Sequence, residues 1–254
     1  MEYFAVKGGR PLEGTIAVHG AKNSALPILA ATLLAQGESV IHNCPDLTDT
    51  NAALDILSSL GCRVRREGRT VTVDTTNRTG TAVPDALMGQ MRASVLFLGS
   101  LLAQGGEAVA SWPGGCALGT RPIDLHIRAF QALGAEVRDQ EGKLVCQTKG
   151  LRGRRLALPF PSVGTTENAM LAACGAVGVT VIDNAAREPE IQDLQGFLQG
   201  LGADVQGAGT SQIVIRGGKT LHPGEYTRCS ADSLPASVCR AAVAFAAPPV
   251  SQSI

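Results

Sequence analysis

The sequence has few aromatic residues and no excess of charge of either sign. Aromatic residues make up 4% of the 254 positions, and 22 lysines and arginines balance 22 aspartates and glutamates. Proteins that bind nucleic acid usually cluster basic residues, and those that bind single strands add aromatic rings on which bases stack. The composition therefore predicts that nucleic acid is not a partner.

The cysteines and histidines are scattered rather than grouped. The seven cysteines include no Cys-x-x-Cys pair, and the four histidines lie far apart along the chain. A disulfide framework is typically built from an even set of cysteines, and a zinc site from closely spaced ligands. We therefore expect no metal, no cofactor and a reduced, cytoplasmic setting.

Long apolar runs are also missing. The uncharged runs are shorter than the ~20 residues that a helix needs to cross a bilayer, and the first residues lack the basic and apolar segments of a signal peptide. With 44% hydrophobic residues, the chain can still bury a large core. These features predict a soluble protein without membrane contact, and nothing in the sequence indicates an obligate protein partner.

A pattern of roughly 70 residues occurs three times. Each copy contains Leu-Gly-x-x-Val, at residues 60–64, 133–137 and 201–205. Before this marker lie an apolar segment, a short run of strand-forming residues and a segment with its apolar residues on one helical face, and a hairpin pattern follows it. The pattern predicts buried helices over 24–36, 91–104 and 167–177, strands over 37–42, 106–111 and 178–183, and hairpins over 64–73, 137–146 and 205–215. The glycine of the marker is expected to cap the amphipathic helix in a left-handed conformation.

The order of elements places three helix N-termini on one rim of the molecule. Each buried helix runs out and the following strand runs back, so the loop after the strand returns to the end where the helix began. Helix N-termini carry unpaired N–H groups and favour anions. The residues predicted on this rim are Lys22, Arg92, 162–166 and the loops 44–48, 112–121 and 184–190.

The longest of these loops lies within residues 111–124 and holds Trp112, Cys116 and Arg121 among glycines and prolines. That density of glycine and proline predicts irregular backbone. Most cysteines fill cores, but a thiol on such a loop is expected to be exposed, and the nearby Arg121 can favour its thiolate or bind an anion.

The charged residues of the rim also have structural interpretations. Lys22 lies directly before a predicted buried helix, shortly after Gly20. This position favours an anion-binding role over that of a solvated surface lysine. Arg92 starts an apolar helix, where a charge needs either a structural partner or a bound anion. Arg121 fits a loop ion pair or an anion ligand. Glu188 and Glu190 are interpreted only as acidic residues that suit the start of a helix.

Five sequence blocks together resemble the UDP-N-acetylglucosamine 1-carboxyvinyltransferases, a family of enolpyruvyl transferases. The blocks are Gly20-Ala-Lys22-Asn23, Met91-Arg92-Ala-Ser, Pro113-Gly-Gly-Cys116 with Arg121-Pro-Ile-Asp124-Leu125-His126, Pro161-Ser-Val-Gly164 and Asn184-Ala-Ala-Arg-Glu-Pro-Glu190-Ile. Their order and spacing match the family from about residue 10 to residue 217. The shikimate-pathway enolpyruvyl transferase is similar in fold but lacks the Pro-Gly-Gly-Cys loop.

The resemblance implies an α/β fold, an inside-out α/β barrel of six such units in two lobes, of which three units form one lobe. We expect residues 1–20 to form a strand of the second lobe, residues 21–225 to form the complete first lobe with the catalytic loop, and residues 226–254 to be an aberrant tail at the start of a fourth repeat. The resemblance ends at about Arg228, so we expect a C-terminally truncated chain whose second lobe is largely missing.

The resemblance also implies the chemistry. In this family the sugar 3′-hydroxyl adds to C2 of phosphoenolpyruvate and phosphate is then eliminated, which is the first committed step of bacterial peptidoglycan synthesis and so serves cell shape and division. Cys116 is expected to be the general acid on a loop that closes as a lid, open to alkylation by epoxides such as fosfomycin. The catalytic residues are expected to be Cys116, Lys22 and Arg121; phosphoenolpyruvate is expected to contact Lys22, Asn23 and Arg121, and UDP-N-acetylglucosamine to contact Asn23, Arg92, Arg121, Pro122, Ile123, Asp124, Leu125, Ser162, Val163 and Gly164.

At two points the sequence differs from a complete member of this family, and two other functions are also consistent with it. Thr48 stands where some members of the family carry a lysine, and the general-base aspartate of the family belongs to the second lobe. We therefore expect the chain alone to be inactive, because acid and base must be held together. The alternatives are a shikimate-pathway enolpyruvyl transferase and a non-catalytic lobe that binds a UDP-sugar.

Overall fold

The computed structural model describes residues 20–112 and 123–227, in which α-helices and β-strands alternate. The helices are α1 (Lys22–Ala31), α2 (Thr48–Ser59), α3 (Asp85–Met88), α4 (Leu96–Gly105), α5 (Asp124–Ala132), α6 (Val163–Gly175) and α7 (Pro189–Gly200), with short 3-10 helices η1 (Thr32–Leu34) and η2 (Arg92–Val95). The strands are β1 (Glu38–Ile41), β2 (Arg63–Glu67), β3 (Thr70–Asp74), β4 (Glu107–Ser111), β5 (Glu136–Gln140), β6 (Lys143–Gln147), β7 (Arg155–Ala157), β8 (Gly178–Asp183), β9 (Asp204–Gln206), β10 (Gln212–Gly217) and β11 (Glu225–Tyr226).

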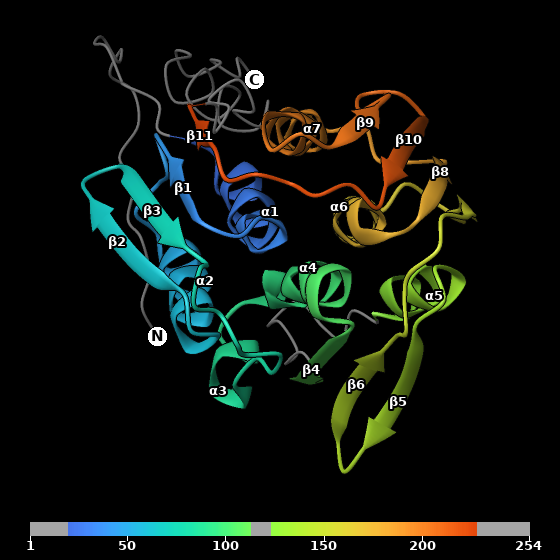
Figure 1. The fold of residues 1–254 in the computed structure, drawn as a ribbon, viewed down its shortest axis with the longest axis horizontal. Coiled ribbons are helices and arrows are strands. Elements are labelled where there is room, and N and C mark those ends of the chain that lie inside the picture. Colours follow the sequence, from blue (N-terminus) through green and yellow to red (C-terminus); the bar gives the residue numbers. More distant parts are fainter. Residues whose placement is uncertain (1–19, 113–122, 228–254) are drawn as a thin grey trace, which may run out of the picture.

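Three helices, α1, α4 and α6, occupy the centre of the molecule, and the sheets and the other helices surround them (Figure 1). The described residues form three units, each with a central helix (α1, α4 or α6), an outer helix (α2, α5 or α7) and an antiparallel sheet. The three sheets of this part have the strand orders β11-β1-β3-β2, β4-β6-β5 and β7-β8-β10-β9. The three α/β units predicted from the repeat, and the inside-out lobe that the family resemblance implies, are confirmed.

The units are joined into a ring by parallel strands. The segment after each hairpin pairs with the first strand of the next unit: Ala82 bridges to Val109 of β4, and β7 pairs with β8. The last segment, β11, pairs in parallel with β1 and so connects the third unit back to the first. Because each connection places the next central helix beside the previous one, the N-termini of α1, α4 and α6 are brought to the same end.

The central helices are buried on nearly all sides because their sequences are apolar nearly all round. Along α4, every residue from Leu96 to Leu102 is buried, and α6 approaches it closely at Gly99. The backbone N–H of Gly99 donates to Asn168 Oδ1 at 2.9 Å, and a Cβ at residue 99 would lie only 2.3 Å from that oxygen. A side chain at this position would therefore separate the two helices.

The strands and hairpins fall close to their predicted ranges, and the marker glycines have the predicted conformation. Gly61, Gly134 and Gly202 follow α2, α5 and α7 with φ of 92°, 99° and 94°. The helix boundaries were less well predicted. The helix predicted over 167–177 begins four residues earlier, because Ser162 caps α6 by accepting a hydrogen bond from Thr165 N at 3.4 Å. The helix predicted over 91–104 begins as the 3-10 helix η2, and the one predicted over 24–36 ends as η1.

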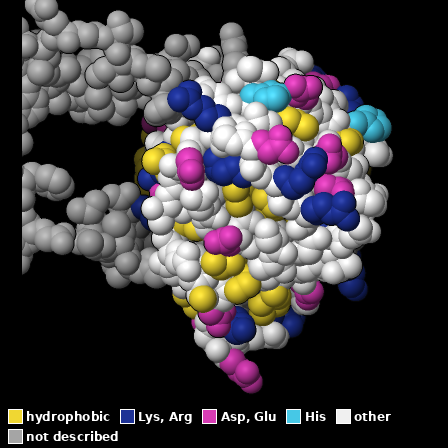
Figure 2. Space-filling model, turned by 90° about the vertical axis from the view of Figure 1, so that its left-hand side faces the viewer, with side chains coloured by type: hydrophobic (Ala, Val, Ile, Leu, Met, Phe, Trp, Pro, Cys, Tyr) yellow, Lys and Arg dark blue, Asp and Glu magenta, His cyan; other side chains and the backbone are white. Residues whose placement is uncertain are grey.

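The surface of the first unit carries charges of both signs side by side (Figure 2). Glu38 pairs with Arg65 at 3.6 Å on the sheet, and His42 Nε2 lies 2.5 Å from Glu225 Oε1 where β11 meets β1. Within residues 20–112 and 123–227, no helix is long and apolar enough to cross a membrane.

Candidate active site

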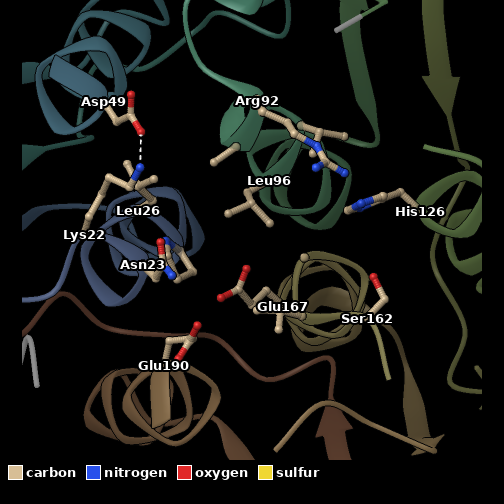
Figure 3. Close-up of a pocket in the computed structure, with 15 residues that line it drawn as sticks. Lys22, Asn23, Leu26, Asp49, Arg92, Leu96, His126, Ser162, Glu167 and Glu190 are labelled. Carbon is tan, nitrogen blue, oxygen red and sulfur yellow. Dashed lines mark hydrogen bonds and ion pairs between the residues drawn. The ribbon is translucent and has the colours of Figure 1, made fainter. Parts of the chain in front are cut away.

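A cavity of about 500 Å³ opens at the N-terminal end of the three central helices (Figure 3). Lys22 and Asn23 of α1, Arg92 of η2 and residues 162–164 at the start of α6 all line it. Asp49 of α2, His126 of α5 and Glu190 of α7 complete the wall from the outer helices. All three units therefore contribute to one cavity, as the predicted rim requires.

The Lys22 side chain lies at one edge of the cavity, where its ammonium group is held by a carboxylate. Its Nζ is 2.7 Å from Asp49 Oδ2, and the two side chains are 45% and 31% exposed. An exposed pair of this kind contributes little to stability, about 0–1 kcal/mol. Its effect is to fix a long flexible side chain, so the Lys22 charge stays at the cavity edge.

Backbone N–H groups supply further positive potential. Among the described residues no side chain caps α1, and Ser162 caps α6 through Thr165 N alone. The remaining N–H groups of a helix's first turn lack partners within the helix and favour an anion. With Lys22 and Arg92, these helix starts make the cavity suited to a ligand with negatively charged oxygens.

His126 enters the cavity as a neutral side chain whose tautomer is set by its neighbours. The orientation of the Asn168 amide is defined, since its Oδ1 accepts from Gly99 N and its Nδ2 donates to Val95 O at 2.9 Å. Asn168 Nδ2 also lies 3.0 Å from His126 Nδ1. An amide nitrogen only donates, so Nδ1 of His126 accepts and the ring proton resides on Nε2.

Burial and, to a smaller extent, the charge of Arg92 lower the pKa of His126 to about 4, against the opposing effect of Asp124. The side chain is 7% exposed. At neutral pH His126 is therefore an uncharged N–H donor beside Gly164 in the cavity wall.

Two acidic side chains also point into this cavity (Figure 3). Glu167 of α6 is 4% exposed and Glu190 of α7 is 7% exposed. Burial raises the pKa of Glu167 well above its usual value, and the charges of Glu190 and Glu188 raise it further. Buried carboxyl groups are unexpected in a site for anions and indicate a specific role.

Of the predicted site residues that the structure describes, most lie together. Lys22, Asn23, Arg92, Ser162, Val163 and Gly164 line one cavity. Ile123, Asp124 and Leu125 lie at the start of α5, where Asp124 faces Arg128 at 3.8 Å, but it is His126 from this helix that lines the cavity. Cys116, Arg121 and Pro122 lie outside the described residues.

Four titratable residues that line the cavity were not predicted as site residues: Asp49, His126, Glu167 and Glu190. Glu167 follows Val163 by four residues, so a helix starting at residue 163 places both on one face. The late predicted start of α6 hid this spacing. Glu190 does begin a helix, as predicted, but its side chain is also part of the cavity wall.

The described cysteines differ from the environment expected for Cys116. Cys44, Cys62, Cys146 and Cys174 are all buried, and burial raises the pKa of each thiol. For Cys146 and Cys174 the pKa rises to about 12. These four cysteines are core residues, as their positions in the sequence indicated.

Taken together, the fold and the cavity define a class: α/β proteins with central helices that gather their N-termini and basic side chains around an anionic ligand. The family model of EPSP synthase (3-phosphoshikimate 1-carboxyvinyltransferase) matches residues 6–250, so the chain belongs to this enolpyruvyl transferase family. The match continues beyond Arg228, where the sequence predicts that the resemblance ends.

Known relatives agree with this assignment. The chain is 51% identical over 227 residues to UDP-N-acetylglucosamine 1-carboxyvinyltransferase 2 of Caldanaerobacter subterraneus, and 49% identical over 230 residues to UDP-N-acetylglucosamine 1-carboxyvinyltransferase of Methylacidiphilum infernorum. Each match covers 89% of this chain and 54% of the relative. The chain thus spans about half the length of the curated relatives it matches.

Solved structures show the same fold. The enolpyruvyl transferase NikO from Streptomyces tendae superposes with a TM-score of 0.75 at 25% identity, over 87% of this chain and 52% of that one. The EPSP synthase from Acinetobacter baumannii superposes with a TM-score of 0.69 at 21% identity, over 87% of this chain and 51% of that one.

Proposed function

We propose that this chain carries one half of the active site for transfer of the enolpyruvyl group from phosphoenolpyruvate to the 3′-hydroxyl of UDP-N-acetylglucosamine, with release of phosphate. The observation that carries the proposal is the single cavity lined by Lys22, Asn23, Arg92 and the start of α6. Both substrates are anions, and these groups offer positive charge and N–H donors from three separate units.

The names of the relatives favour this acceptor over shikimate 3-phosphate. The relatives at 46–51% identity carry the UDP-N-acetylglucosamine name, whereas the superposed EPSP synthase structures are 21–22% identical. The acceptor of this chain would place the protein in peptidoglycan synthesis, with a cytoplasmic location and a role in cell shape and division.

Each residue has a proposed role in the reaction. The sugar 3′-hydroxyl gives its proton to the general base of the second lobe as O3′ bonds to C2 of phosphoenolpyruvate, while the Cys116 thiol donates its proton to the C3 methylene carbon. Lys22, Asn23 and Arg121 hold the carboxylate and phosphate of phosphoenolpyruvate, and they stabilise the charge that develops there. The C2–O bond to phosphate then breaks, phosphate leaves with the proton from the general base, and C3 returns a proton to the Cys116 thiolate, which restores the vinyl group.

The nucleotide sugar is proposed to lie across the second and third units. Arg92, Ser162, Val163 and Gly164 would contact it from the described cavity wall, and Arg121, Pro122, Ile123, Asp124 and Leu125 from the loop and the start of α5. The loop that carries Cys116 would close over both substrates and exclude water.

Calorimetric titration and a phosphate-release assay on the 254-residue protein test the proposal. We expect UDP-N-acetylglucosamine to bind, and Arg92→Ala to weaken binding about tenfold through loss of one charge-assisted contact. Phosphate release by these residues alone should be undetectable, because they span about half the length of their relatives and the resemblance implies that the general base of the family belongs to the other lobe. A preference for shikimate 3-phosphate, or no binding of either acceptor, would refute the proposal.

A second test uses the cysteines. Iodoacetamide or fosfomycin should modify Cys116 in the native protein, while the four buried cysteines react only after unfolding. Peptide mass mapping after a short exposure measures this difference. Equal labelling of Cys116 and Cys174 would contradict an exposed, activated thiol in the loop.

A further inference from the structure

The carboxyl groups of Glu167 and Glu190 are not explained by the proposed reaction. Both are more than nine-tenths buried, both line the cavity, and within residues 20–112 and 123–227 neither has a hydrogen bond or an ion pair. Burying a carboxylate without a hydrogen-bond partner costs free energy, so buried polar groups in proteins are normally hydrogen-bonded. Where such carboxyl groups line a cavity, the expected hydrogen-bond partner is a bound ligand.

The two groups are held in place by different elements. Glu167 projects from the second turn of α6, and Glu190 from the first turn of α7. Ala186 N donates to Thr166 Oγ1 at 3.1 Å, which fixes the segment before α7 against α6. The carboxyl groups therefore face the same cavity without having been drawn together by a contact of their own.

Of the two carboxyl groups, Glu167 is the one whose charged form is disfavoured. Its side chain is 4% exposed, and like charges nearby raise the cost of ionising a buried carboxyl. Burial, and then the charges of Glu190 and Glu188, raise the pKa of Glu167 well above its usual value.

We propose that Glu167 is a positioning residue that keeps its proton at neutral pH and donates it as an O–H hydrogen bond to an anionic oxygen, phosphate or carboxylate, of the bound ligand. Glu190 is the neighbouring acidic group that, together with burial, disfavours ionisation of Glu167. This extends the proposed function, since it adds a donor to the same cavity.

The proposal predicts that ligand affinity depends on pH. When Glu167 loses its proton, a donor becomes a negative charge facing the ligand, and affinity falls. The other charged or titratable groups around it are Lys22 of α1, Asp49 of α2, Arg92 of η2, His126 of α5, and Glu188 and Glu190 of α7. His126, with its pKa of about 4, keeps one state from pH 6 upward.

Infrared difference spectroscopy tests the protonation state without any ligand. We expect a carboxylic acid C=O band at pH 7 in the 254-residue protein that disappears in Glu167→Gln. The matched control is Glu188→Gln, which removes an exposed carboxylate at the start of α7. It should keep the band, because burial and Glu190 raise the pKa of Glu167 more than Glu188 does. Absence of the band from the wild-type protein at pH 7 would overturn the proposal.

Sulfate binding tests the donor role, because the charge of sulfate is constant between pH 6 and 9. Wild-type affinity should fall about tenfold or more as the pH rises and the infrared C=O band of Glu167 disappears. Glu167→Gln keeps a donor that does not titrate, so its affinity should stay at the wild-type pH 6 value. Glu167→Met removes the donor and should bind about tenfold more weakly at pH 6.

The outcomes separate this inference from the proposed function. If sulfate follows this pattern but neither UDP-N-acetylglucosamine nor phosphoenolpyruvate binds, the proposed function fails and the role of Glu167 stands. The role of Glu167 is overturned if sulfate does not bind, or if the Gln and wild-type proteins show the same pH dependence.

Discussion

The two ends of the central helices are built in opposite ways. At the N-terminal end, the cavity wall contains Lys22, Asp49, Arg92, Glu167 and Glu190. At the C-terminal end, a smaller hollow of about 320 Å³ has one charged residue among its described lining, Lys219. There the backbones pack so closely that a Cβ on Gly175 would lie 2.5 Å from Ala103 O.

The C-terminal end of the central helices contributes mainly to the stability of the fold, and the N-terminal end contains the candidate ligand-binding cavity. Close packing and paired backbone groups stabilise the C-terminal end, where the Gln104 side chain also donates to the Leu34 carbonyl. The N-terminal end holds buried acids at a cost in stability, as functional sites commonly do. Substitutions at the two ends should therefore change different measurable properties.

The largest expected effect is at the closely packed end. Gly175→Ala places a methyl group against the backbone of α4, and neither helix can move aside without disturbing the core. We expect a loss of about 3 kcal/mol in the free energy of unfolding, measured by urea denaturation. Gly200→Ala is the matched control, because it also changes the last residue of a helix but meets nothing within 4 Å.

The control should stabilise the protein by up to about 1 kcal/mol, since alanine favours helix over glycine. Equal losses in the two variants would mean that helix propensity, not close approach, determines the effect. A Gly175→Ala protein as stable as the wild type would show that the C-terminal end is not close-packed.

The second largest effect is expected at the N-terminal end of the central helices, where acid should destabilise the fold through His126. The pKa of His126 is about 4 in the folded protein, below its usual 6.5, so the unfolded chain takes up this proton first. Stability due to His126 is therefore complete above pH 6.5 and is lost as pH falls toward 4, by about 3 kcal/mol. Urea denaturation at pH 7 and pH 4 measures the change.

His126→Gln should remove that part of the acid sensitivity, whereas His222→Gln, which changes an exposed histidine, should keep it. The ionisation of Glu167 changes the pH dependence of stability in the opposite direction. Its raised pKa means that its contribution is complete at low pH and is lost as pH rises through the folded pKa. If the pH dependence is the same in His126→Gln and wild type, His126 is not buried as a neutral ring.

The arrangement of the three units was more predictable from the sequence than the individual residues that line the cavity. The spacing of the Leu-Gly-x-x-Val markers and the apolar segments predicted the three units, their strands and the shared rim, because burial and chain direction leave few arrangements. The individual cavity residues depend on helix boundaries, which sequence patterns define poorly. Shifting the start of α6 by four residues is what conceals Glu167.

The rim also shows why charge alone is a poor guide to partners. The sequence singled out the cations Lys22 and Arg92, because a positive charge at a helix start has an evident ligand. It interpreted Glu190 only as an acid at the start of a helix, which is common, and it did not single out Asp49. Only the folded chain shows that Asp49 holds Lys22 and that Glu190 faces Glu167 across the same cavity.

The smallest expected effect on stability is at Lys22. Lys22→Met removes an ion pair whose side chains are 45% and 31% exposed, so the free energy of unfolding should change by less than about 1 kcal/mol. Phosphoenolpyruvate affinity, measured by calorimetry in the presence of UDP-N-acetylglucosamine, should nevertheless fall about tenfold or more, because a charge-assisted contact is lost.

Asp49→Asn is the complementary variant to Lys22→Met, because it removes the ion-pair partner of Lys22 but keeps the positive charge of the lysine. If Asp49 only fixes the lysine side chain, affinity should fall less than in Lys22→Met, and stability should again change little. If Asp49→Asn instead increases affinity, the ion pair competes with the ligand for Lys22. A loss of several kcal/mol of stability in either variant would contradict the division between the two ends, since it would make the charged end part of the structural core.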